Sequence, residues 1–138
     1  MTAFDIVRLD RLRAALACGP ELQLGVLFGS RANGRAGSAS DFDVGIIPSD
    51  PRLSLHDELA LAAALSGAVS TEVDVVRLDD GPPLLGAEVA RGGVCLFERA
   101  PGIFAAYRAD SISRWIDFED TIAPHRARFL GRLAGGRR

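Results

Sequence analysis

Four short apolar segments in this chain lie among longer stretches whose apolar residues recur at helical spacing, in the predicted order helix-strand-strand-helix-strand-helix-strand-helix. The short segments contain β-branched or aromatic residues and run into glycine, proline or polar residues, as strands do. They are Leu22 to Phe28, Phe42 to Ile47, Glu72 to Leu78 and Val94 to Phe97. Strands that alternate with helices predict an α/β domain in which helices pack against a small mixed sheet.

The first and third predicted helices have recognisable start and stop signals. Apolar residues recur at steps of three and four over residues 4–17, and Cys18-Gly19-Pro20 ends that helix. Pro82-Pro83 opens the third helix, and Gly92-Gly93 terminates it.

The second helix is predicted to begin at Ser54, with Asp57 three residues later in the capping-box arrangement. Its apolar face is expected to consist of Leu55, Leu59, Ala62, Leu65 and Val69. After Pro101 the chain is predicted to be helical to about Ala123, followed by a break at Pro124 and a last short helix.

The chain is predicted to form a single domain, residues 1–138, with a C-terminal helical segment at about 101–134. The apolar stripe of that segment consists of Ile112, Trp115, Ile116 and Ile122, and we interpret Trp115 as a core residue. The two cysteines, Cys18 and Cys95, lie near the ends of apolar elements and are interpreted as small buried hydrophobic residues.

Composition excludes several classes of protein. The chain is 48% hydrophobic and 25% charged, which is typical of a globular domain. Its longest apolar run, Leu59 to Leu65, is far shorter than the ~20 residues needed to cross a bilayer. The N-terminal segment has no signal-peptide pattern, and two cysteines make no disulfide framework. We therefore expect no membrane association and a cytoplasmic location.

Charge narrows the set of binding partners. Sixteen basic residues against eighteen acidic ones give a net charge of −2, so we expect no direct binding of nucleic acid. The chain contains no lysine, which excludes a P-loop lysine and Schiff-base chemistry. From Pro124 to Arg138 there are five arginines and no acid. This segment is either a solvated tail or a docking element for an acidic partner.

Three aspartates indicate a metal site. Asp41 and Asp43 are two residues apart at the start of a predicted strand, so their carboxylates point to the same face. Asp74 lies within the apolar run Val73 to Val76, where a buried charge would need a partner. Because hard oxygen ligands suit magnesium, a shared Mg²⁺ site would account for all three acids.

Gly29 and Ser30 follow the first predicted strand and are suited to binding phosphate. Glycine allows the backbone to approach an anion closely, and the serine hydroxyl can donate a hydrogen bond to it. An isolated Gly-Ser turn or an isolated pair of aspartates is weak support. Their combination, in this order and on these elements, indicates a nucleotide site.

Gly29-Ser30, Asp41-Phe42-Asp43 and the later Asp74 together resemble the signature of the polymerase β-like nucleotidyltransferase superfamily. The stretch GSRANGRAGSASDFDVGII is most similar to its minimal nucleotidyltransferases (MNT). PPLLGAEVARGGVCLFER resembles the helix–glycine–strand unit that follows the third aspartate in that group. The resemblance extends over about residues 22–130 and implies a polymerase β-like nucleotidyltransferase fold.

Within this group the chain resembles the MntA-type adenylyltransferase antitoxins of HEPN–MNT (type VII) toxin–antitoxin pairs. The resemblance implies transfer of AMP from ATP to a tyrosine of a cognate HEPN ribonuclease toxin, which silences the toxin. One departure is Asn33, where the family often has arginine. Arg31 or Arg35 is the expected substitute for the phosphate contact.

The expected mechanism is an in-line displacement at the α-phosphorus of ATP, with two magnesium ions. Asp41 and Asp43 would hold both ions, and Asp74 would complete one of them beside the attacking hydroxyl. Gly29 and Ser30 would bind the β- and γ-phosphates.

Two alternatives remain open at this stage. The first is a nucleotidyltransferase for a small hydroxyl substrate, as in aminoglycoside-modifying relatives, although residues 75–138 leave little chain to enclose such a substrate. The second is an antitoxin that neutralises its partner by binding alone and keeps a vestigial site. The intact Gly29-Ser30 pair and the three aspartates argue against the second alternative.

Overall fold

The computed structural model describes residues 3–29 and 42–135, so the predictions for Ser30, Arg31, Arg35 and Asp41 fall outside the described residues. The elements are α1 (Ala3–Ala17), β1 (Leu22–Phe28), β2 (Phe42–Pro48), α2 (Leu55–Val69), β3 (Val73–Arg77), α3 (Pro83–Gly92), β4 (Val94–Glu98) and α4 (Ile103–Gly135). The predicted order of helices and strands is confirmed.

The four strands form one mixed sheet in the order β3-β2-β1-β4. β1 is antiparallel to both of its neighbours, β2 and β4, whereas β2 and β3 are parallel. β3 is therefore an edge strand, and β2 lies between β3 and β1.

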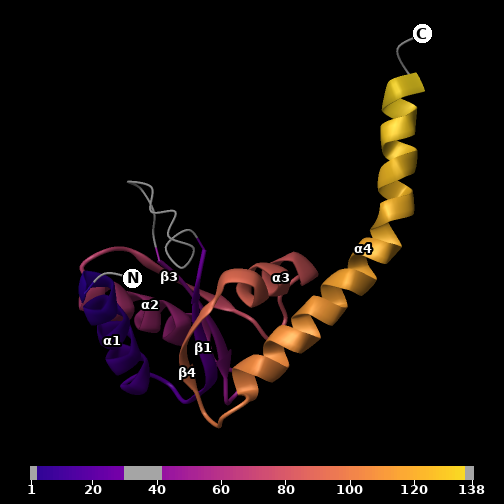
Figure 1. Ribbon diagram of the computed structural model, residues 1–138. Helices are drawn as coiled ribbons and strands as arrows, with labels where there is room; N and C mark the ends of the chain where they lie inside the picture. Colours follow the sequence, from indigo (N-terminus) through magenta and orange to yellow (C-terminus); the bar gives the residue numbers. More distant parts are fainter. Residues whose placement is uncertain (1–2, 30–41, 136–138) are drawn as a thin grey trace.

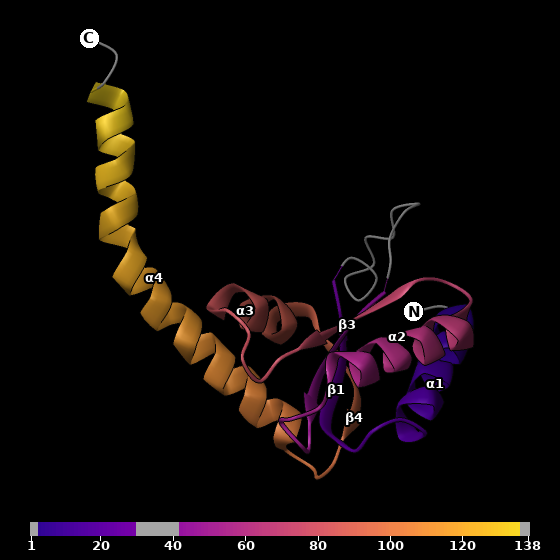
Figure 2. The same cartoon turned by 180° about the vertical axis from the view of Figure 1, so that it is seen from behind.

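Helices cover both faces of the sheet (Figures 1 and 2). α1 and α2 pack on one face, over a core that includes Leu12, Val44 and Leu65. α3 and the first turns of α4 pack on the other, over a core that includes Leu24, Val26 and Val89. Alternate strand residues supply the two cores, which is why β1 and β2 are buried almost throughout.

The predicted apolar face of α2 is wrong in part. Leu55 and Leu59 are 68% and 61% exposed, whereas Leu61, Leu65 and Val69 are buried. Residues 59–65 are apolar on every side of the helix, so the pattern alone could not identify the face that meets the sheet. The start of α2 is as predicted, because the Ser54 side chain accepts a hydrogen bond from the Asp57 backbone N–H at 3.1 Å.

The predicted break at Pro124 is also wrong. α4 runs without interruption from Ile103 to Gly135, with Pro124 inside it. A proline within a helix cannot donate to the carbonyl four residues earlier, here Asp120, and it bends the helix rather than always ending it. α4 is visibly bent in its middle, and its second half extends away from the rest of the molecule (Figure 1).

Two predictions of burial are corrected. Ile112 and Ile116 are about half exposed and Trp115 is only half-buried, so the predicted stripe on α4 does not belong to the core. Cys18 is exposed because it follows the last turn of α1, beyond the part that packs on the sheet, whereas Cys95 is partly buried.

No helix among the described residues is long and apolar enough to cross a membrane.

Candidate active site

The parallel pairing of β2 and β3 places two of the predicted site residues next to each other. Asp43 and Asp74 are register partners, so they lie on adjacent strands and on the same face of the sheet. The residues that flank them, Phe42, Val44 and Val73, are buried in the core beneath α1 and α2. The two aspartates therefore lie on the opposite face, the one that α3 and α4 cover in part.

Asp74 is exposed, which corrects its interpretation as a charge inside a buried strand. β3 is an edge strand, and Asp74 is its second residue, so solvent reaches the carboxylate. The order of strands in a sheet depends on tertiary packing, and the apolar run around Asp74 did not reveal that β3 lies at the edge. An exposed carboxylate in this position is accessible to a cation and to an incoming substrate.

Gly29 brings the end of β1 against Asp43. Phe28, the residue before it, pairs with Asp43 in the β1–β2 ladder. Gly29 has a φ of +90°, a backbone conformation that residues with a Cβ atom rarely adopt. A Cβ atom at this position would lie 2.6 Å from Oδ2 of Asp43, so glycine leaves space beside the carboxylate.

Hydrogen bonds fasten the strands that carry the aspartates. The Phe42 backbone N–H donates to the Glu72 carbonyl at 3.1 Å, which joins the start of β2 to the residue before β3. The Val73 N–H donates to the Ser66 hydroxyl at 2.9 Å. That hydroxyl in turn donates to the Ala62 carbonyl at 2.7 Å. Sequence analysis did not single out Ser66, whose only signal is a lone hydroxyl in the second half of an apolar helix.

The described part of the site fits a magnesium ion by its donor chemistry. Two carboxylates stand side by side on neighbouring strands, and Mg²⁺ prefers hard oxygen ligands. Asp41, the third predicted ligand, and the phosphate-binding residues Ser30, Arg31 and Arg35 lie outside the described residues. Among the residues that the structure describes, no group of three or more His, Cys, Asp or Glu side chains could hold a metal.

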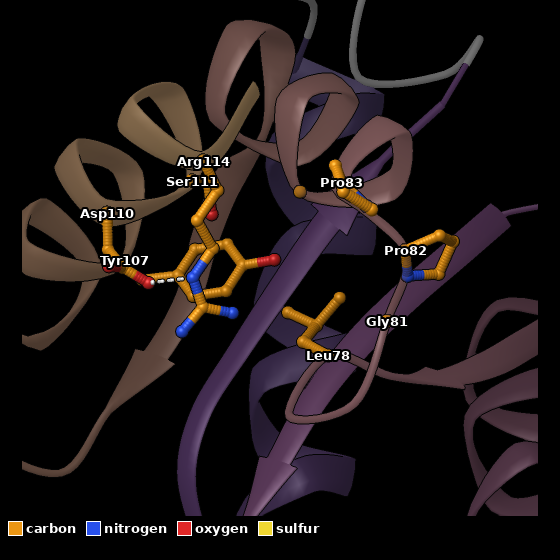
Figure 3. A pocket seen from close by; sticks show the side chains of 9 residues that line it. Leu78, Gly81, Pro82, Pro83, Tyr107, Asp110, Ser111 and Arg114 are labelled. Carbon is orange, nitrogen blue, oxygen red and sulfur yellow. Dashed lines mark ion pairs between the residues drawn. The ribbon is translucent and has the colours of Figure 1, made fainter. Parts of the chain in front are cut away.

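A small pocket opens between the start of α3 and α4, and Figure 3 shows it from close by. It is lined by Leu78, Gly81, Pro82, Pro83, Gly86, Tyr107, Asp110, Ser111 and Arg114. Burial raises the pKa of the Tyr107 hydroxyl, and Arg114 donates to Asp110 at 2.9 Å. Gly29, Asp43 and Asp74 are not among the lining residues, so this pocket is separate from the candidate site.

Comparison with known proteins decides the family. Residues 11–101 match the family model described as polymerase beta, nucleotidyltransferase. The chain belongs to this nucleotidyltransferase family. The matched segment includes Gly29, Asp43 and Asp74, and the resemblance inferred from the sequence is thereby confirmed.

Solved structures with the same fold include chains from toxin–antitoxin complexes. One, from a toxin–antitoxin complex with AMP-PNP, is 24% identical with a TM-score of 0.76, over 88% of this chain and 98% of that one. A second comes from a complex of a tri-AMPylated Shewanella oneidensis HEPN toxin with its MNT antitoxin. It is 22% identical with a TM-score of 0.71, over 89% of this chain and 96% of that one. No functionally curated protein matches the sequence.

Proposed function

We propose that this nucleotidyltransferase is an antitoxin that transfers AMP from ATP to a hydroxyl of a partner protein, a tyrosine of a cognate HEPN ribonuclease toxin. The observation that carries the proposal is the register pairing of Asp43 with Asp74 beside Gly29. This arrangement puts two acidic side chains and a glycine at one end of the sheet, in a chain of the nucleotidyltransferase family.

The chemistry follows from the residues at this end of the sheet. We assign Asp41, Asp43 and Asp74 as ligands of magnesium, which when bound neutralises the triphosphate and lowers the pKa of the attacking hydroxyl. Gly29 and Ser30 would bind the β- and γ-phosphates, and Arg31 or Arg35 would add a further phosphate contact.

The reaction is a displacement at phosphorus. The partner's hydroxyl oxygen attacks the α-phosphorus, a new O–P bond forms, and the bond to the β-phosphate breaks. Pyrophosphate leaves, and the hydroxyl proton passes to the exposed carboxylate of Asp74 and then to water. Only glycine fits at position 29 beside the Asp43 carboxylate, because a Cβ atom there would lie 2.6 Å from Oδ2.

Two observations support a protein as the acceptor. Asp74 is exposed on an edge strand, so a segment of another protein can reach it. The similar structures include a tri-AMPylated HEPN toxin in complex with an MNT antitoxin. The type of acceptor and the type of nucleotide are therefore inferred for this chain by analogy with that complex.

Pyrophosphate release tests the proposal and separates it from the small-molecule alternative. The purified chain is incubated with ATP and Mg²⁺ together with either a HEPN-type toxin or an aminoglycoside. We expect stoichiometric pyrophosphate release with the toxin and none with the aminoglycoside. Release with the aminoglycoside alone would instead identify a small-molecule nucleotidyltransferase.

A further inference from the structure

An apolar seam on α4 continues beyond the body of the protein. Phe104, Tyr107 and Ser111 face α3 and the sheet, and Gly86 of α3 lies against Ser111. The same helix face continues at steps of three, four or seven residues through Trp115, Phe118, Ile122, Phe129 and Leu133, which we call the distal seam. Its C-terminal members lie on the half of α4 that extends away from the other elements (Figures 1 and 2).

Trp115 and Ile122 of the distal seam are half-buried, whereas its other members are exposed. Phe129 and Leu133 are 56% and 55% exposed, and Phe118 is 36% exposed. The rings of Trp115 and Phe118 contact each other, with centroids 5.6 Å apart, so the seam begins with an aromatic cluster. Exposed apolar side chains that recur along one helix face indicate an interface.

The charges along this half of α4 change sign at Pro124. Residues 115–123 contain three acids, Asp117, Glu119 and Asp120, and no basic residue. Residues 125–135 contain three arginines, Arg126, Arg128 and Arg132, and no acid. The seam is also centred there, because Trp115 and Leu133 are equally distant from Pro124 along the chain.

We infer that the distal seam binds the distal seam of a second copy of this chain, with the two α4 helices antiparallel. Antiparallel pairing about Pro124 places the acidic half of each helix along the basic half of the other, whereas parallel pairing would oppose like charges. In that alignment Phe118 packs near Phe129 of the second copy, and Glu119 lies near its Arg126.

Sedimentation velocity of the purified full chain tests this inference. We expect a concentration-dependent species of twice the 14.6 kDa chain mass. Phe129→Glu should raise the dimer dissociation constant about tenfold or more, because it places a charge in the buried seam. The matched control Leu55→Glu alters a leucine on α2 that is still more exposed, at 68%, and should leave the dimer unchanged.

Charge reversal provides an independent test that does not remove an apolar side chain. Glu119→Arg and Arg126→Glu should each weaken the dimer, and the double variant should restore it, with helical circular dichroism unchanged throughout. The inference is overturned if the chain is monomeric at every concentration, including the case in which α4 binds only an added HEPN-type toxin. It is also overturned if a dimer forms that neither Phe129→Glu nor the charge reversals affect.

Discussion

The backbone of Gly29 and the carboxylate of Asp43 are in close contact: a Cβ atom on Gly29 would lie only 2.6 Å from Oδ2 of Asp43. The contact joins the end of β1 to the start of β2. Asp74 of β3 lies on the other side of Asp43. The three residues therefore form a continuous strip across the ends of three adjacent strands.

Gly29→Ala should reduce both stability and AMP transfer. The positive φ alone costs a residue with a side chain about 1–3 kcal/mol, and the new methyl group displaces the Asp43 carboxylate. Gly102→Ala is the matched control, because Gly102 has a φ of +97° and no atom lies within 4 Å of the place its methyl group would take. Urea unfolding should show similar losses for both variants, whereas only Gly29→Ala should lose transfer. Equal activity of the two variants would refute a role for the Gly29–Asp43 contact.

Asp74→Asn should remove Mg²⁺-dependent ATP binding without unfolding the protein. The side chain is exposed, so its substitution leaves no buried group unsatisfied. A ligand that binds only the folded state raises the melting temperature, so Mg²⁺ with ATP should stabilise the wild type and not this variant. Asp80→Asn, at another exposed aspartate just after β3, should respond like the wild type. If Asp74→Asn also retains the full thermal shift, Asp74 is not a ligand.

Ser66→Ala should destabilise the fold and weaken catalysis indirectly. The hydroxyl of Ser66 accepts the Val73 N–H at the start of β3, one residue before Asp74. Loss of this partner should lower the free energy of unfolding by about 1–2 kcal/mol, as measured with urea. Ser113→Ala, at an exposed serine on α4, should change it by less than about 0.5 kcal/mol. Equal stabilities of the two variants would show that the Ser66 bond contributes nothing.

The ion pair between Arg77 and Asp79 should make stability depend on pH in the acid range. Their atoms Nη2 and Oδ2 are 2.5 Å apart and both side chains are mostly buried, and the hydrogen bond from Arg77 lowers the pKa of Asp79. Because the folded-state pKa lies below the unfolded value of about 3.9, the stabilisation is complete above that value. It is lost as the pH falls through the lower pKa of the folded state.

Asp79→Asn should accordingly be less stable than the wild type by about 1–2 kcal/mol at neutral pH, and the difference should shrink towards pH 2. The measurement is urea unfolding across this pH range. Asp50→Asn is the control, because Asp50 and Arg52 form an ion pair that is largely exposed to solvent. A stability difference for Asp79→Asn that is independent of pH would contradict the account.

Local signals in the sequence predicted the order of the elements and several of their ends. The start of β2 at Phe42 and the cap at Ser54 are examples, because apolar runs and capping residues act over a few positions. The exposed position of Asp74 and the buried face of α2 could not be predicted in this way. Both depend on which strand forms the edge of the sheet and on which helix face meets it, and these are tertiary choices.

The candidate site shows the same division between local and tertiary information. The acidic residue types and their spacing indicated a metal site on adjacent strands, and the structure places Asp43 and Asp74 in register. The hydroxyl bond from Ser66 to β3 joins residues seven positions apart across a helix end, and no pattern in the sequence marks it. Pro124 was a misleading signal, because its effect on α4 is a bend.

The intact mass of the partner protein tests the central claim most directly. The chain is mixed with a HEPN-type toxin, ATP and Mg²⁺, in parallel with the Asp43→Asn variant. The account predicts a mass increase of the toxin by one or more AMP units with the wild type, no increase with the variant, and loss of ribonuclease activity only in the modified toxin. Full neutralisation of the toxin by Asp43→Asn with no change in mass would contradict it and would identify an antitoxin that acts by binding alone.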